Sequence, residues 1–261
     1  METKRFVADD SIILKIWGTT DITLFIFAGA AAEFALNKQV DWLYYTGKLP
    51  ADPIGRLFST VDYAQQIIFQ MESKANDSIS KINSIHHGVE HSRGRSIPAE
   101  AYKDVLFMLI HYSISAYELL ERKLTIAEKD EVVVTFRRIA ERMHMADLPV
   151  DYVEWQSQYS KNLQSNLEYS AYTKDLFKQY RKHLGVLRYF IVVEIQKRLV
   201  PAEVKKILGY NNSFFVAAAI PFYRLIRKFP IHIRAILLLV PARFKEKVWH
   251  MDRRRWQLQP A

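Results

Sequence analysis

The chain has 261 residues, of which 49% are hydrophobic and 25% charged, a composition typical of a globular protein and incompatible with a disordered one. It contains no cysteine, which excludes disulfides, zinc–thiolate sites, iron–sulfur clusters and thiolate-ligated iron. The formal net charge is +9, and residues 197–256 alone carry fourteen Lys and Arg against three acids. This basic region predicts contact with phosphate in lipid headgroups or nucleic acid, although a face that only keeps the protein soluble explains it equally well.

Helical periodicity runs along almost the whole chain and strand alternation is hard to find, so we expect one all-α globular domain over residues 1–261. Residues 1–17 read as a lead-in and 49–55 as a loop. Thr125 and Glu128 form a predicted capping box, while Pro221 and Pro241 predict a kink or break in the last two helices. The expected helices are 22–37, 56–73, 74–91, 99–122, 126–143, 150–164, 175–181, 186–199, 202–208, 213–228 and 231–248.

The N-terminus lacks the apolar core and small-residue cleavage site of a signal peptide. The longest apolar stretch, residues 22–36, is interrupted by Glu33 and is too short to span a bilayer. We therefore expect a soluble or membrane-peripheral protein of the cytoplasm.

Three of the eight histidines lie within six residues, at His86, His87 and His91. Imidazole is the commonest metal ligand, and its protonation is easily tuned near neutral pH. His86 shares a helical stripe with Ile82 and Val89 and is expected to point inward, whereas His87 and His91 lie on a different face. This cluster is the best candidate for a metal or cofactor site; for His86 the alternative is a hydrogen-bonded core histidine.

An arginine and two hydroxyls precede the histidines. Arg56, Ser59 and Thr60 are spaced i, i+3 and i+4, so they project from one face of a helix. A guanidinium beside a hydroxyl suits an anionic group or a polarised oxygen species. The structural alternative is an ion pair between Arg56 and Asp52 or Asp62.

His111 ends the apolar run 105–110, and burying it there requires a partner. Three roles remain open at this point: a second ligand, a hydrogen-bond donor to a bound cofactor, or a structural hydrogen bond to Tyr112 or Ser115.

The segment 87–91 also matches the H-x-x-E-H pattern of inverted zinc proteases, in which two histidines bind zinc and the glutamate activates water. A pattern with three fixed positions matches often by chance. Those enzymes also need a third ligand and a sheet edge, and this chain offers no clear strand. A zinc hydrolase is therefore a less favoured hypothesis, ranked third behind the two that are stated below.

Four segments taken in order carry a resemblance to a known family: DPIGRLFST (52–60), IHHGV (85–89), IHYSISAYE (110–118) and LTIAE (124–128). Together they resemble the MpaB/rubber-oxygenase catalytic domain, over about residues 18–163 and more loosely beyond. The resemblance implies an all-helical fold that holds a non-covalent haem b. It further implies oxidative cleavage of carbon–carbon double bonds in isoprenoid chains by dioxygen.

The resemblance also implies roles for particular residues. His86 would be the proximal iron ligand, Arg56 and Thr60 would lie on the distal side, and His111 would be a pocket residue. Rubber oxygenases place a lysine just before the threonine as a distal ligand, where this chain has Ser59. They also use an upstream acidic base, for which Asp41 is the nearest candidate.

The leading hypothesis is a haem b oxygenase-like protein that acts with dioxygen on a hydrophobic, isoprenoid or prenylated substrate. Its basic C-terminal helices, 197–256, would hold it on an anionic membrane. The competing hypothesis is a non-enzymatic helical protein that binds anionic lipid or nucleic acid through the same region, with Arg253 to Arg255 as the side chains to neutralise.

Overall fold

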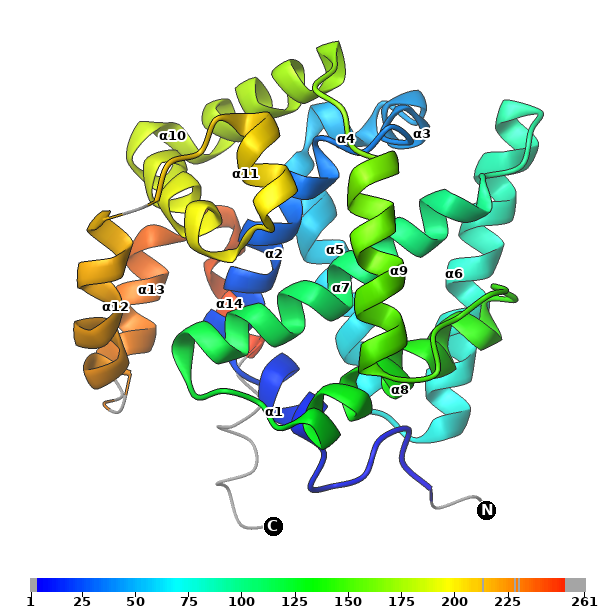
Figure 1. Cartoon of the computed structure of the whole chain (residues 1–261), viewed down its shortest axis with the longest axis horizontal. Helices are drawn as coiled ribbons and strands as arrows, with labels where there is room; N and C mark the ends of the chain where they lie inside the picture. Colours follow the sequence, from blue (N-terminus) through cyan, green and yellow to red (C-terminus); the bar gives the residue numbers. More distant parts are fainter. Residues whose placement is uncertain (1–3, 213, 228, 230, 252–261) are drawn as a thin grey trace.

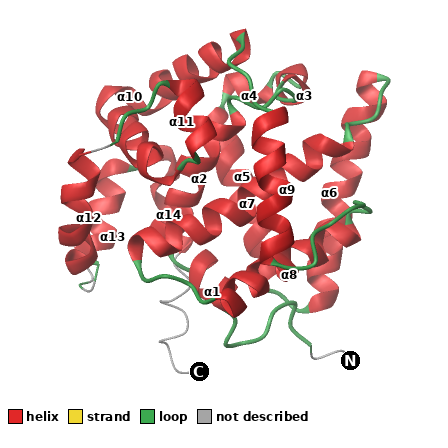
Figure 2. Cartoon of the chain, viewed as in Figure 1, coloured by secondary structure: helices red, strands yellow, loops and turns green. Residues whose placement is uncertain are grey.

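The computed structural model describes residues 4–212, 214–227, 229 and 231–251, and every regular element in these ranges is a helix. The expected all-α class is therefore confirmed (Figure 1, Figure 2). The elements are α1 Ile12–Trp17, α2 Thr20–Phe34, α3 Asp41–Tyr45, α4 Lys48–Ala51, α5 Pro53–Ile68, α6 Glu72–Arg93, α7 Ala99–Leu120, α8 Ile126–Arg142, α9 Tyr152–Ser165, α10 Ala171–Leu199, α11 Ala202–Leu208, α12 Phe214–Ile226, α13 Ile231–Leu239, the 3₁₀ turn Ala242–Phe244 and α14 Lys245–Met251.

Helix α2 runs through the middle of the molecule and packs most extensively against α7. Its sequence is apolar on most sides, which is the pattern of a helix buried all round. Gly29 allows the close approach of α7, because a Cβ at this position would lie 2.4 Å from the ring of Tyr112. The two helices carry much of the core between them, and the other helices are arranged around this pair.

Local capping explains where several helices begin. The predicted capping box is confirmed, with the Thr125 hydroxyl accepting from the Glu128 N–H and the Glu128 carboxylate accepting from the Thr125 N–H. The loop expected at 49–55 is wrong, because α4 and the start of α5 fill it. Asp52 accepts a hydrogen bond from Gly55 N and Pro53 supplies the preset φ of a first helical turn.

Glycine and proline shape the C-terminal third. The helices expected at 175–181 and 186–199 form one element, α10, whose direction changes at Gly185, where φ is +76°. Pro221 lies inside α12 without ending it, whereas α13 ends just before Pro241. Arg253 to Arg255 lie outside the described residues. Within the described ranges, no helix is both long and apolar enough to cross a bilayer.

Candidate functional site

His86 projects from α6 toward α5 and the start of α7. Its ring is half-buried and lies edge-on to Tyr102, with centroids 5.1 Å apart and an interplanar angle of 63°. The Nδ1 atom is buried and has no hydrogen-bond partner among the described residues. Buried polar nitrogens are normally paired, so an unpaired one needs an explanation.

The electrostatic surroundings keep His86 neutral at pH 7. Burial lowers the pKa of the imidazole, and the nearby Arg56 guanidinium lowers it further, whereas Glu90 raises it. Burial, followed by the charge of Glu90, raises the pKa of Tyr102 to about 12. A neutral imidazole with a free lone pair is the form that binds a metal.

Arg56, Ser59 and Thr60 lie on the part of α5 that faces away from the core cavity described below. Burial lowers the pKa of the half-buried Arg56 guanidinium, and no carboxylate pairs with it among the described residues. The hydroxyls of Ser59 and Thr60 donate to the carbonyl oxygen of Arg56, at 2.7 and 3.3 Å. Their oxygens can still accept, so this face offers an unpaired cation and two acceptors.

The structural alternative for Arg56 is not what the structure shows. Asp52 pairs with Arg243 at 2.6 Å and Asp62 pairs with Lys247, so each carboxylate holds the C-terminal segment. The Arg56 charge is left facing His86.

The H-x-x-E-H segment does not form a metal site. The His87 side chain is 76% exposed, and its Nδ1 pairs with Glu90 at 3.0 Å. Glu90 also accepts from the N–H of Ile97, which secures the turn after α6. The described residues contain no group of three histidine, cysteine or acidic side chains that could hold a metal ion, so the zinc hypothesis lacks its third ligand.

Asp41, the nearest candidate for a base, is engaged elsewhere. Its carboxylate pairs with Arg93 at 2.5 Å and with Arg95 at 3.2 Å. Both guanidiniums also lie over the ring of Trp42, at 4.0 and 4.9 Å from its centroid. The group fastens α3 to the end of α6, and Asp41 is not free to act as a base.

His111 is not brought next to His86. It lies nine positions beyond Tyr102 on α7, which is about 14 Å along the helix axis. Its Nε2 lies 3.2 Å from the Leu199 carbonyl, to which the Nε2–H tautomer donates, and 3.3 Å from Ser115 Oγ. Burial lowers its pKa to about 4. A structural hydrogen bond is therefore present, but its partner is the Leu199 carbonyl, with Ser115 Oγ also near the same nitrogen.

A polar group that the sequence did not reveal surrounds His111. Glu33 of α2 accepts hydrogen bonds from the hydroxyls of Tyr112 and Tyr159, at 2.8 and 2.6 Å, and both rings contact the imidazole of His111. Burial raises the pKa of Glu33 to about 7, against the lowering effect of the two hydroxyls. We call Glu33, Tyr112, Tyr159 and His111 the polar core cluster; its one sequence signal is a lone acid inside an apolar helix.

Asp104 forms a second buried group nearby. Its carboxylate accepts from the side-chain amides of Asn37, Asn162 and Asn166, at 2.6, 2.5 and 2.8 Å. Burial raises the pKa of Asp104 although the amides lower it. The carboxylate joins α7 to α9 and to the segment after α2, so we assign Asp104 a structural role.

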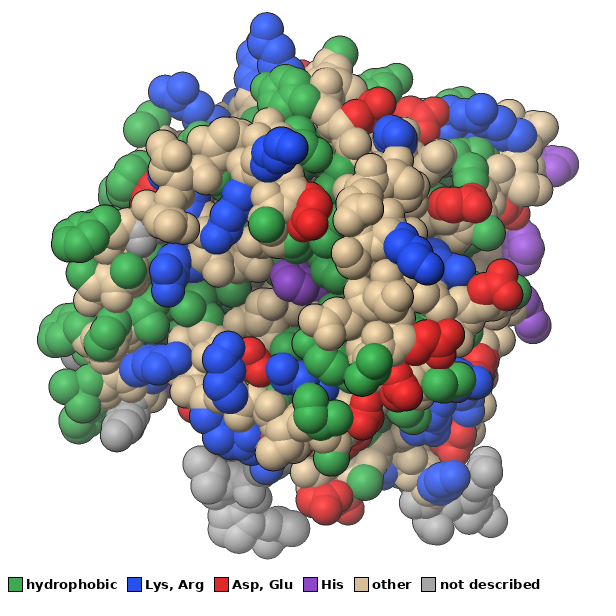
Figure 3. Space-filling view, viewed as in Figure 1, with side chains coloured by type: hydrophobic (Ala, Val, Ile, Leu, Met, Phe, Trp, Pro, Cys, Tyr) green, Lys and Arg blue, Asp and Glu red, His purple; other side chains and the backbone are tan. Residues whose placement is uncertain are grey.

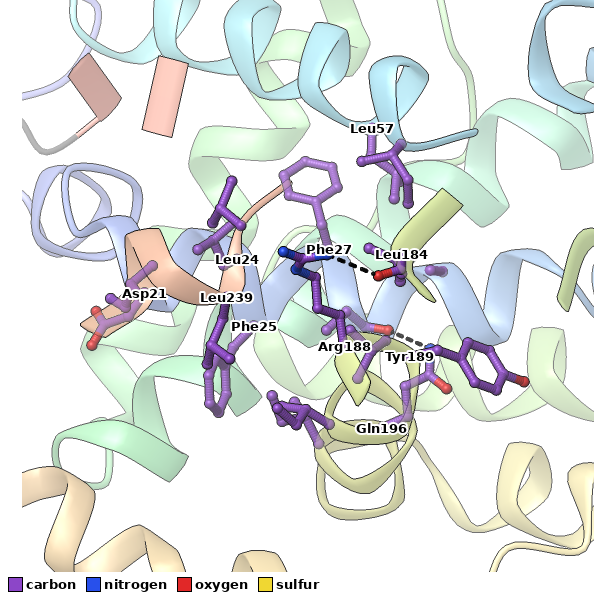
Figure 4. Close-up of a pocket in the computed structure, with 18 of the residues that line it drawn as sticks. Asp21, Leu24, Phe25, Phe27, Leu57, Leu184, Arg188, Tyr189, Gln196 and Leu239 are labelled. Atoms are coloured by element: carbon purple, nitrogen blue, oxygen red, sulfur yellow. Dashed lines mark hydrogen bonds between the residues drawn. The ribbon is translucent and has the colours of Figure 1, made fainter. Parts of the chain in front are cut away.

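A cavity of about 420 Å³ lies between α2, α5, α10, α12 and α13, and its walls are almost entirely apolar (Figure 4). Arg188 of α10 is a cation on this wall, and its guanidinium donates to the Leu184 carbonyl at 3.3 Å. Cavities of this size and apolar lining typically bind small hydrophobic ligands.

Helix α5 separates the cavity from the histidine. Ile54, Leu57 and Val61 line the cavity, whereas His86, Arg56 and Thr60 are not part of its wall. Leu57 and Val61 lie four positions apart on one stripe of α5, and Arg56 and Thr60 lie on a stripe turned by about 100° from it. The cavity wall and the His86 group are therefore on different faces of α5, and no histidine of the described ranges lines the cavity.

Comparison with known proteins finds no match among curated proteins and none among solved structures. A family described as "ER-bound oxygenase mpaB/B'/Rubber oxygenase, catalytic domain" matches residues 17–256. The match confirms the resemblance inferred from residues 18–163 and extends it through the basic C-terminal helices. The chain belongs to this family of oxygenase catalytic domains.

Proposed function

We propose that the protein is a haem b-dependent oxygenase-like enzyme in which His86 holds the iron and the apolar cavity takes a hydrophobic, isoprenoid or prenylated substrate. The observation that carries the haem assignment is the buried Nδ1 of His86, which has no partner among the described residues. Family membership supports oxygenase chemistry, and dioxygen is the oxidant that we propose.

The residues around His86 fit an iron ligand in their chemistry. The imidazole is neutral, Arg56 has no carboxylate partner among the described residues, and Ser59 and Thr60 retain acceptor oxygens. When bound, haem iron supplies the redox chemistry that activates dioxygen. Arg56 would then hold an anionic group, such as a haem carboxylate, through charge-assisted hydrogen bonds, and the Thr60 hydroxyl would orient it by donating to it in place of the Arg56 carbonyl.

The cavity supplies the other requirement, a dry site for an apolar chain. Its wall is almost entirely apolar, and Arg188 is placed to bind a polar end of the substrate. Oxidative cleavage of a double bond is the reaction that we propose for such a chain, whose double bond would have to extend past α5 from the cavity to reach iron at His86.

Haem binding is tested first, with haemin added to the purified chain and to His86→Ala. We expect a Soret band for the unmodified chain, its loss in His86→Ala, and its partial return when free imidazole is added to that variant. His87→Ala is the matched control, because the neighbouring imidazole is exposed and paired with Glu90. A Soret band that is indifferent to His86→Ala contradicts the assignment.

The cavity is tested separately with Ala219→Phe, which places a ring into the cavity from α12. We expect at least about tenfold weaker binding of a fluorescent prenyl alcohol, since the added ring takes the volume of several methylenes. The Soret band should not change, because Ala219 and His86 lie on different sides of α5. Unaltered probe binding would exclude the cavity as the substrate site.

The basic C-terminal third favours a further role, contact with an anionic surface.

A further inference from the structure

Helix α12 has an outer face that is unusual for a surface helix. Val216 and Ile220 point inward and are buried, but Phe214 on the outside is 87% exposed and Phe222 is 67% exposed. A surface helix normally turns charged or polar residues outward, and a helix that is apolar all round is normally covered. The outer face of α12 is therefore shaped for contact with another apolar phase.

Neighbouring helices extend this surface. The ring of Phe190 on α10 lies 6.1 Å from that of Phe215 on α12, and α12 and α13 line the same cavity. Figure 3 shows hydrophobic side chains gathered along the edge formed by these helices. We call the following exposed side chains the apolar face: Val186, Leu187, Phe190, Phe214, Phe222 and Leu238.

The mouth of the cavity belongs to the same surface. Phe215 and Leu239 both line the cavity, and they are 58% and 44% exposed. Side chains that are part of the wall and also meet solvent mark its rim. A phase that covers the apolar face therefore also meets the opening of the cavity.

Positive charge is concentrated in the same part of the chain. Residues 181–251 carry fourteen Lys and Arg against three acids, whereas residues 1–180 carry twenty against twenty-four. Arg181, Lys182, Arg198 and Arg234 are exposed on the helices that bear the apolar face. Apolar side chains with cations beside them are the pattern of helices that lie in the interface of an anionic bilayer.

We propose that α10, α12 and α13 dock on an anionic lipid bilayer, with the apolar face inserted among the headgroups and the cavity opening toward the lipid. A second copy of the chain does not fit this surface, because it would bring two strongly basic regions together. Nucleic acid fits less well, since Val186, Leu187 and Leu238 have no ring on which a base could stack. The docking does not depend on haem at His86, so the two proposals fail independently.

The test is flotation of the full chain with vesicles of phosphatidylcholine, alone or with about one third phosphatidylserine. We expect binding to the anionic vesicles that weakens steeply as salt is raised, since exposed charges are screened. Phe214→Ser/Phe222→Ser should weaken partitioning at least about tenfold, because two phenyl groups are lost from the interface. Arg234→Gln should weaken it about fivefold, the contribution of one cation near a charged surface.

Matched controls lie away from the apolar face. Val150→Ser/Val153→Ser removes two exposed apolar side chains, one just before α9 and one in its first turn, and Lys81→Gln removes one exposed lysine of α6. Neither should alter partitioning, and all variants should keep the helical circular dichroism of the parent.

Two results would overturn the proposal. One is binding that is equal for neutral and anionic vesicles and unaltered by the two serines. The other is a dimer in sedimentation that Phe214→Ser/Phe222→Ser dissociates, which assigns the face to a second copy of this chain.

Discussion

The polar core cluster and the surroundings of His86 are two polar groups set against a helical core, but they differ in how completely their atoms are paired. Glu33 has two tyrosine hydroxyls, and His111 has a carbonyl and aromatic rings on its faces. His86 has a buried nitrogen without a partner and a neighbouring arginine without a carboxylate, among the described residues. Complete pairing rigidifies a core, whereas unmet pairing leaves a group available to a ligand.

The contrast predicts large stability effects at the paired carboxylates. Asp104→Ala should lower the free energy of unfolding by about 4 kcal/mol, because one buried and two half-buried amides lose their shared acceptor. Urea denaturation measures this. Asp77→Ala, at an exposed position of α6, should stay within about 0.5 kcal/mol of the parent. Equal effects at the two positions would show that Asp104 is not structural.

Glu33 gives the polar core cluster a pH dependence. Its folded pKa of about 7 lies above the reference value of 4.5, so the folded state holds the proton more tightly and stability falls as pH rises through that window. Glu33→Gln cannot ionise and should gain stability relative to the parent between pH 5 and pH 8, by about 3 kcal/mol.

His111 contributes a pH dependence of stability that is opposite in sign to that of Glu33. The effect of Glu33 is therefore measured as the difference between the parent and Glu33→Gln. Its folded pKa of about 4 lies below the reference value of 6.5, so its contribution to stability rises with pH between those values. The parent alone should therefore respond weakly below pH 6.5, where the two contributions offset each other. A difference between parent and Glu33→Gln that does not vary with pH would mean that Glu33 is already ionised at pH 5.

The smallest expected effects are at His86, and they are opposite in sign for its two charged neighbours. Arg56→Gln should raise the pKa of His86, because a cation that disfavours the imidazolium is removed, and Glu90→Gln should lower it. NMR titration of the His86 ring protons measures the pKa of His86 in both variants. Shifts of the same sign in the two variants would place the ring away from one of these side chains.

Much of the helical fold could be predicted from local signals. Both ends of α11 and the capping box before α8 match the sequence expectation, because proline, glycine and threonine with glutamate fix those ends locally. The sequence predicts two helices where the structure has the single kinked α10, because Gly185 alone departs from helical angles and the helix continues after it. Asp52 and Pro53 fall in the loop that the sequence predicts, although in the structure Asp52 caps α5 and Pro53 starts it.

The candidate site was predictable only where its members share one helix or adjacent helices. The inward direction of His86 and the common face of Arg56 and Thr60 follow from helical spacing. The partners of Glu33 lie 79 and 126 positions away along the chain, and no local pattern links them. The cavity likewise depends on five helices meeting, which periodicity does not specify.

The end of α12 opposite Phe214 is fastened by Arg227, whose guanidinium pairs with the buried Asp21 and lies 2.8 Å from Glu121. Water and dissolved ions hardly reach this contact, because Arg227 and Asp21 side chains are 6% and 1% exposed. Added salt should therefore detach the protein from lipid at concentrations that leave the Arg227–Asp21 ion pair intact. Salt therefore distinguishes the two contacts: it releases the protein from the bilayer but leaves α12 attached to the rest of the fold, so the protein can bind the bilayer again.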